Sequence, residues 1–358
     1  MLRAGLIGFP SSGKTTLFQL MTQALETSHS RRRGDAAVGI SRVPDERLDH
    51  LTAMFNPKKH VPTTVQFSDP TGQQGPTSTV DVSVFREADA LLHVVRAFQS
   101  ETAPPPSGSV DPGRDIRLME EELILNDLDV VERRLQRVNQ DLKKGKNTTL
   151  DQEKAVLTQC RESLEEGTPV RALNLDEHLQ KQLRGFQLLS AKPLLLILNL
   201  DETDLSQNTR ADASPGIERI KDKLTHAHVP VCAKIELEIS QLDPSDAQTF
   251  LADLGLVESS LDRVIRAAFQ LLGYISFFTV GEDECRAWAV PKGTIAQAAA
   301  HEIHSDIARG FIRAEVVSYE PLKERGSLHT CREHGEVRLE GKEYEVQDGD
   351  VINFRFAT

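Results

Sequence analysis

A chain of 358 residues is long enough for two or three domains with a sizeable buried core. Its 39% hydrophobic and 27% charged residues argue against a disordered protein, and its net charge of −12 argues against general attraction to nucleic acid. No apolar run reaches the ~18 residues that span a bilayer, and the N-terminus does not resemble a signal sequence. The four cysteines form no C-x-x-C pair, which argues against a zinc site and a disulfide framework. We therefore expect a cytoplasmic protein with no membrane partner.

The pattern of apolar runs predicts a nucleotide-binding α/β domain that begins at the N-terminus. Residues 2–8 have the pattern of a buried strand that leads into a Gly-rich turn, and residues 14–25 have the pattern of a helix. Further short apolar runs, separated by helical stretches, predict a doubly wound, mostly parallel sheet. These runs are residues 61–67, 90–95, 193–198 and 229–233.

A long charged segment interrupts this pattern. From residue 115 onward, apolar residues recur at three- and four-residue spacing up to Leu142, and helical periodicity resumes at Leu150 after the break at residues 143–147. We predict an antiparallel helical hairpin over residues 113–189, which is either a docking arm or a plain structural insertion. The lysines at its turn are either solvated or form a local contact with RNA.

The last part of the chain changes character again, with short β-type segments around one predicted helix at 295–307. This pattern predicts a compact α+β module. The expected domains are 1–112 with 190–275 for the nucleotide-binding domain, 113–189 for the hairpin and 276–358 for the C-terminal module. The β-type segments are residues 277–280, 284–289, 314–318, 337–339, 342–346 and 351–356.

A complete phosphate-binding motif, G-x-x-x-x-G-K-[ST], follows the first strand from Gly8 to Thr15. Its glycines allow backbone N–H groups to surround an anion at a helix N-terminus. We expect Lys14 to reach the β- and γ-phosphates and the Thr15 hydroxyl to bind Mg²⁺. The expected phosphate-binding residues are Gly8, Pro10, Ser11, Ser12, Gly13, Lys14, Thr15 and Thr16.

A second motif, D-x-x-G, ends the strand at residues 63–69. Asp69 is expected to complete the Mg²⁺ site, and Gly72 to sense the γ-phosphate through its N–H. Gln73 stands where Ras-like GTPases place the glutamine that orients the attacking water. Either Gln73 has this catalytic role or it is an ordinary polar loop residue.

The base-binding end is predicted at residues 199–202, where N-L-D-E replaces the N-K-x-D motif of GTPases. Glu202 is too long to reproduce the bidentate contact that aspartate makes with guanine, which favours ATP over GTP. A shift in register would instead bring Asp201 or Asp204 to the base. The expected base-binding residues are Asn199, Leu200, Glu202, Cys232, Ala233 and Lys234.

With these motifs placed, the chain resembles the Obg-like ATPase (YchF-type) family of translation-factor-class P-loop NTPases. The N-x-x-E motif carries the likeness, as do several segments of the C-terminal half. The resemblance implies a G-domain, an inserted coiled-coil arm and a C-terminal ubiquitin-like TGS module. It also implies preference for ATP, slow hydrolysis and association with the ribosome. These segments are residues 231–236, 253–256, 263–267, 286–288, 304–306, 310–316 and 347–351.

Two regions depart from the family pattern. Residues 28–40 lack the threonine of the first switch, and the loop that begins with residues 73–76 is shorter than the second switch. We therefore expect a monomeric, nucleotide-gated binding protein whose hydrolysis is slow. The alternatives are a GTP-specific switch and a nucleotide-binding scaffold without significant hydrolysis.

Overall fold

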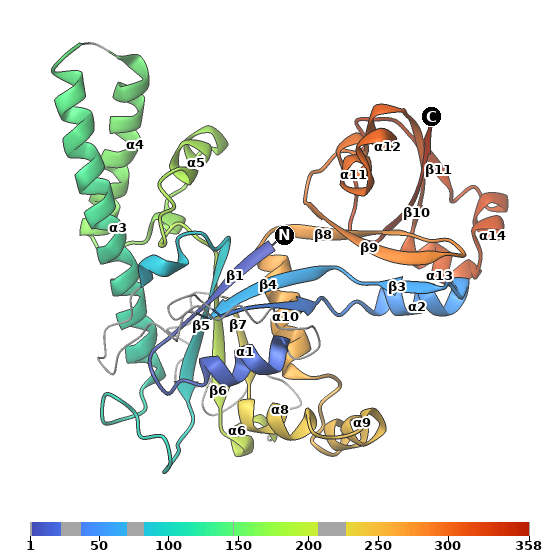
Figure 1. Cartoon of the computed structure of the whole chain (residues 1–358), viewed down its shortest axis with the longest axis horizontal. Helices are drawn as coiled ribbons and strands as arrows, with labels where there is room; N and C mark the ends of the chain where they lie inside the picture. Colours follow the sequence, from blue (N-terminus) through green and yellow to red (C-terminus); the bar gives the residue numbers. More distant parts are fainter. Residues whose placement is uncertain (1, 23–36, 70–81, 146, 207–226, 358) are drawn as a thin grey trace. The chain divides into compact units, whose positions relative to one another are not determined.

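The computed structural model describes residues 2–22, 37–69, 82–145, 147–206 and 227–357 (Figure 1). The chain divides into two compact units. The first comprises Met1–Ser41 and Gln66–Ala268, and the second comprises Arg42–Val65 and Phe269–Thr358. None of the helices in the described ranges has the length and apolar composition needed to cross a membrane.

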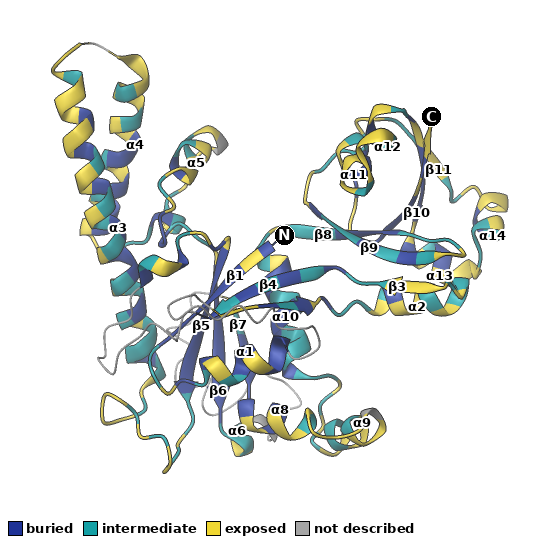
Figure 2. Cartoon of the chain, in the orientation of Figure 1, coloured by how far each residue is buried: buried dark blue, intermediate teal, exposed yellow. Residues whose placement is uncertain are grey.

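A six-stranded sheet forms the centre of the first unit, in the order β2-β4-β1-β5-β6-β7. The pairs β1–β5, β5–β6 and β6–β7 are parallel, as the alternation of apolar runs and helices predicts. Nearly every residue of β5 and β6 is buried, because the central strands of such a sheet are covered on both faces (Figure 2). The strands are β1 (Leu2–Ile7), β2 (Ala37–Arg42), β4 (Thr64–Asp69), β5 (Ala90–Ala97), β6 (Leu194–Leu200) and β7 (His228–Val231).

The inserted segment is the predicted helical hairpin, formed by α3 (Pro112–Leu142) and α4 (Thr148–Glu165). Asp111 caps α3 by accepting a hydrogen bond from Arg114 N, and proline stands in its first turn, where a missing N–H costs nothing. Met119 and Leu123, near the start of α3, pack in the sheet core, whereas Val131 and later residues pack against α4. One helix therefore continues from the core of the domain into the arm.

Shorter elements complete the first unit. The 3₁₀ helix η2 contributes Val82 and Phe85 to the sheet core, next to the start of α3. The remaining elements are η2 (Val82–Phe85), η3 (Val170–Ala172), α1 (Lys14–Thr22), α5 (Glu177–Arg184), α6 (Glu202–Ser206), α8 (Ala233–Ile239), α9 (Pro244–Asp253) and α10 (Ser260–Leu271), which continues three residues into the second unit.

The second unit is built on a mixed sheet of order β11-β10-β12-β8-β9-β3. Small residues of α11, such as Ala299 and Ala300, allow this helix to pack closely on Phe277 and Val316. The unit contains α2 (Glu46–Phe55), β3 (Lys59–Val61), β8 (Tyr274–Thr279), β9 (Glu284–Pro291), α11 (Ala296–Ile303), α12 (Ser305–Arg309), β10 (Phe311–Ser318), α13 (Tyr319–Arg325), α14 (Leu328–Glu333), β11 (Arg338–Glu340) and β12 (Asp350–Phe356).

Three details of this unit differ from the sequence-based expectation. Residues 42–65, expected in the nucleotide-binding domain, cluster here because β3 pairs with β9 and the side chains of α2 pack on Phe278. The strand predicted at 342–346 is wrong, since only an isolated bridge between Ile295 and Glu345 forms there. The helix predicted at 295–307 is interrupted at His304, whose extended backbone (φ −164°) caps α12.

The predicted fold class is confirmed. The chain has a mostly parallel α/β domain, an inserted helical arm and a C-terminal α+β module. The carboxyl ends of β1, β4, β5, β6 and β7 meet at one edge of the first sheet, and this edge carries the phosphate-binding loop, Asp69 and the residues predicted to bind the base.

Candidate nucleotide-binding site

The loop between β1 and α1 closes around its own lysine. Lys14 Nζ donates hydrogen bonds to the carbonyl oxygens of Gly8 (2.7 Å) and Phe9 (3.0 Å), and the residue is only 5% exposed. Burial lowers the pKa of Lys14 to about 8, an effect that the negative charge of Asp69 partly opposes. The loop thus holds a buried ammonium group next to the N-terminus of α1. Both the positive charge and the helix N-terminus would stabilise a bound anion.

Gly13 is required by both its backbone and its surroundings. Its φ is +96°, and a Cβ atom here would lie 2.3 Å from Asn199 Nδ2. The buried Asn199 side chain donates to Ser12 O (3.0 Å) and accepts from Ala233 N (3.1 Å). This side chain therefore fastens the phosphate-binding loop to the first residue of α8.

The Thr15 hydroxyl and the Asp69 carboxylate meet next to this loop. Thr15 Oγ1 donates to Asp69 Oδ2 at 3.2 Å, and Asp69 is buried at the carboxyl end of β4. A hydroxyl and a carboxylate are the hard oxygen ligands that Mg²⁺ prefers. The donor set therefore fits a magnesium ion held together with phosphate oxygens.

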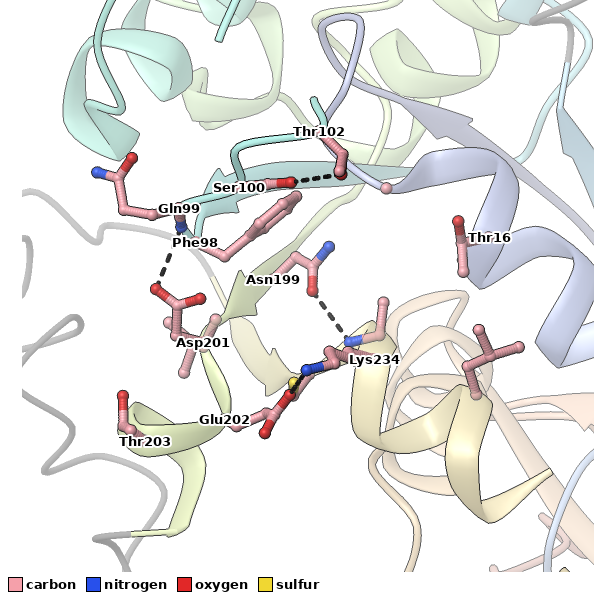
Figure 3. Close-up of a pocket in the computed structure, with 15 residues that line it drawn as sticks. Thr16, Phe98, Gln99, Ser100, Thr102, Asn199, Asp201, Glu202, Thr203 and Lys234 are labelled. Carbon is pink, nitrogen blue, oxygen red and sulfur yellow. Dashed lines mark hydrogen bonds and ion pairs between the residues drawn. The ribbon is translucent and has the colours of Figure 1, made fainter. Parts of the chain in front are cut away.

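A cavity of about 620 Å³ lies beside the loop (Figure 3). Four segments form its walls: the start of α1, the loop after β5, the loop after β6 and the start of α8. Its size suits a nucleoside, because ligand cavities commonly measure ~300–1,000 Å³. The lining residues are Gly13, Thr16, Phe98, Gln99, Ser100, Thr102, Asn199, Leu200, Asp201, Glu202, Thr203, Cys232, Ala233, Lys234 and Leu237.

Two of the acidic residues after β6, Asp201 and Glu202, line this cavity and have partners there (Figure 3), whereas Asp204 is not among the lining residues. Glu202 forms an ion pair with Lys234, and Asp201 Oδ2 accepts a hydrogen bond from Gln99 N at 3.1 Å. One oxygen of each carboxylate is therefore already engaged, whereas a bidentate contact with guanine needs both oxygens of one carboxylate.

Most of the residues predicted for the site gather at this edge of the sheet. The loop residues Lys14 and Thr15 meet Asp69, and all six base-binding residues line the cavity. Pro10 and Ser12 instead line a second, smaller cavity beneath the loop. Gly72, Gln73 and most of the first-switch segment lie outside the described residues.

Sequence reasoning missed the end of β5 and the segment that follows it, including Arg96 and Phe98. Arg96 is 3% exposed and donates to Ser11 O (3.2 Å) and Ala103 O (2.7 Å), so it joins the phosphate-binding loop to the wall of the cavity. The signal was available, because β5 lies next to β1 and the loops at the carboxyl ends of adjacent parallel strands converge.

The buried strand, the glycine-containing loop around Lys14 and the Thr15–Asp69 pair define a P-loop NTPase with a G-domain fold. Comparisons with known proteins show to which family of P-loop NTPases the chain belongs. The family model YchF-GTPase_C, described as "Protein of unknown function (DUF933)", matches residues 274–357.

Two relatives match over 99% of both chains: "Ribosome-binding ATPase YchF" of Bacillus subtilis (strain 168), which is 42% identical, and the protein of the same name from Escherichia coli O157:H7, which is 37% identical. The solved structure of the Schizosaccharomyces pombe YchF GTPase superposes with a TM-score of 0.87 at 27% identity, over 99% of this chain and 97% of that one. The chain belongs to the YchF family.

Proposed function

We propose that this protein binds a magnesium–nucleoside triphosphate, prefers ATP to GTP, hydrolyses it slowly and uses it to control association with the ribosome. The observation that carries the proposal is the loop from Gly8 to Thr15, wrapped around a buried lysine beside a nucleoside-sized cavity. A buried ammonium group at a helix N-terminus favours an anion with several oxygen acceptors, and a polyphosphate supplies them.

In this proposal Lys14 exchanges partners when the nucleotide binds. Its ammonium group leaves the carbonyl oxygens of Gly8 and Phe9 and contacts the β- and γ-phosphates. The N–H groups of the loop and of the first turn of α1 surround the same phosphates. Thr15 and Asp69 would hold Mg²⁺, which supplies positive charge for the phosphate oxygens.

The cavity favours adenine for two reasons. Guanine recognition needs a carboxylate that accepts from the ring N–H and the 2-amino group, whereas Glu202 pairs with Lys234 and Asp201 accepts from Gln99 N. Adenine has no 2-amino group and leaves no donor unsatisfied in such a site. Calorimetric titration of ATP and GTP in the presence of Mg²⁺ tests this preference, and a tighter complex with GTP would overturn it.

A GTP-specific switch is the second candidate, because the S. pombe structure that superposes on this chain is described as a GTPase. The same titration separates the two. In both cases we propose that Gly72 senses the γ-phosphate and that Gln73 aligns the attacking water. If Gln73→Ala leaves single-turnover hydrolysis unchanged, Gln73 has no catalytic role.

The macromolecular partner is proposed from the relatives, which are named ribosome-binding ATPases. The arm formed by α3 and α4, with the exposed Lys143 and Lys144 after α3, is the surface we propose for this contact. We propose that the protein is a monomer and that it lies in the cytoplasm, where ribosomes are found.

Co-sedimentation of the full chain with ribosomes, with ADP or a non-hydrolysable ATP analogue, tests the control by nucleotide. The proposal predicts a clear difference between the two nucleotides, and the difference should be absent in Lys14→Ala. Equal binding in all conditions would show that the nucleotide does not regulate the contact.

A further inference from the structure

Ser11, in the middle of the phosphate-binding loop, has a backbone conformation that serine rarely adopts. Its φ of +61° lies in the left-handed region, where the Cβ atom crowds the following carbonyl oxygen. Only two other non-glycine residues in the described ranges have a positive φ. Ser11 is exposed, so burial of its side chain does not hold the backbone in this conformation. The conformation therefore needs support from another part of the chain.

Arg96, near the end of β5, contacts the backbone at this residue. Arg96 Nη1 donates a hydrogen bond to Ser11 O at 3.2 Å. A hydrogen bond from a charged donor is stronger than one between neutral groups, and its contribution is comparable to the cost of a left-handed serine. The contact is therefore strong enough to keep Ser11 in the observed conformation.

Arg96 is itself held in one position. Its Nε donates to Phe98 O (3.1 Å), its Nη2 donates to Ala103 O (2.7 Å), and the guanidinium carbon lies 4.5 Å from the centre of the Phe98 ring. The residue is 3% exposed, and the carboxylates of Asp115 and Asp201 stabilise its positive charge. Because these contacts fix the planar guanidinium group, Arg96 Nη1 is a rigid donor toward the loop.

We propose that Arg96 is a positioning residue of the phosphate-binding loop, which holds Ser11 in the left-handed conformation before the nucleotide binds. Backbone N–H groups converge on an anion when right-handed and left-handed residues follow one another in a loop. Without Arg96, Ser11 would leave the left-handed region in much of the free protein, and only the remaining fraction could bind the phosphates. The inference rests on the proposed function, because the effect is measured as nucleotide affinity.

A glycine at position 11 separates this role from the other effects that Arg96 could have. Glycine adopts positive φ about as readily as negative φ, so a loop with Ser11→Gly does not need Arg96 to hold this residue. If Arg96 acted on the phosphates through its charge, or only stabilised the end of β5, its loss would be equally damaging with serine or glycine at this position.

The test is a double-variant cycle with the full chain, in which calorimetry measures binding of a non-hydrolysable ATP analogue with Mg²⁺. Arg96→Gln keeps a donor at the place of Nε, opposite Phe98 O, but lacks the terminal group that bonds to Ser11 O. With serine at position 11 we expect Arg96→Gln to lower the affinity roughly tenfold. In the Ser11→Gly background the same substitution should lower it by less than about threefold.

Arg114→Gln is the matched control. Arg114 is also partly buried, and its guanidinium group bonds to Ser109 and Asp115, with no hydrogen bond to the phosphate-binding loop among the described residues. This variant should bind the analogue as the wild type does. Urea denaturation shows whether Arg96→Gln is folded, and Arg96→Met, which keeps the aliphatic stem against Phe98, replaces it in the cycle if it is not.

Two results would overturn the role of Arg96. They are wild-type affinity in the folded Arg96 variant, and a loss of affinity that is the same with serine and with glycine at position 11. Absence of binding by the wild-type chain is a different result, because it would refute the proposed function and this inference with it.

Discussion

We expect Lys14 to make nucleotide affinity depend on pH. Burial lowers its pKa to about 8 in the free protein, whereas phosphate contact favours the charged form and raises the pKa in the complex. Above pH 8 the free protein must therefore take up a proton to bind ATP. At pH 9 the free lysine is only about one-tenth protonated, so we expect affinity to fall about tenfold relative to pH 7.

Calorimetry measures this linkage directly. The number of protons taken up on binding is obtained by comparing the binding enthalpy in buffers of different ionisation enthalpy. We expect an uptake of about 0.9 proton per nucleotide at pH 9 and of close to zero at pH 7. Affinity that is constant from pH 7 to 9, with no proton uptake, would show that Lys14 is not the group that meets the phosphates.

The same pKa has a consequence for stability without nucleotide. Because the folded-state pKa lies below the ordinary lysine value of 10.5, the unfolded chain binds more protons between pH 8 and 10.5. The titration of Lys14 therefore raises the free energy of unfolding as pH increases across that window. Lys14→Met removes the titrating group, so this part of the pH dependence should vanish in chemical denaturation of the variant.

Three further substitutions test the contacts around the site and the arm. Asn199→Ala leaves Ser12 O and Ala233 N without their partner, and should lower the free energy of unfolding by about 2–5 kcal/mol in urea denaturation. Gly13→Ala forces a methyl group against Asn199 Nδ2 and should weaken nucleotide binding strongly while lowering the melting temperature only slightly. Displacement of a fluorescent nucleotide measures the affinity, and scanning calorimetry measures the melting temperature. Asp127→Ala removes the buried acceptor of two backbone N–H groups at the base of the arm, and should cost about 3–5 kcal/mol in the same denaturation assay. A loss below 1 kcal/mol would contradict the roles given to Asn199 and Asp127, and unchanged nucleotide affinity in Gly13→Ala would contradict the role of Gly13.

Local sequence patterns predicted the parts of the fold that depend on local chemistry. Apolar runs located the central strands, and the three- and four-residue spacing up to Leu142 located α3, because one stripe of a helix must be buried. Long-range pairing was not visible. Residues 59–61 give no signal of their partner β9, and residues 342–346 have strand composition without a neighbouring strand to pair with.

In the candidate site, too, local motifs were predicted and contacts between distant segments were not. Lys14, Thr15 and Asp69 were predicted because their chemistry requires a fixed spacing or a strand end. Arg96 was not predicted, because a lone arginine at the end of an apolar strand carries no motif, and its hydrogen bond to Ser11 O exists only when β5 lies beside β1. The partners of Asp201 and Glu202 likewise depend on loops that only the folded chain brings together.

The central claim is that the cavity beside the phosphate-binding loop holds a nucleotide. Equilibrium binding of a fluorescent ATP analogue to the full chain, in the presence of Mg²⁺, measures this. We predict one saturable site per chain, displaced by unlabelled ATP more readily than by GTP, and lost in Lys14→Ala. Absence of saturable binding by any nucleoside triphosphate, or undiminished binding in Lys14→Ala, would contradict the assignment of this cavity and loop as a nucleotide site.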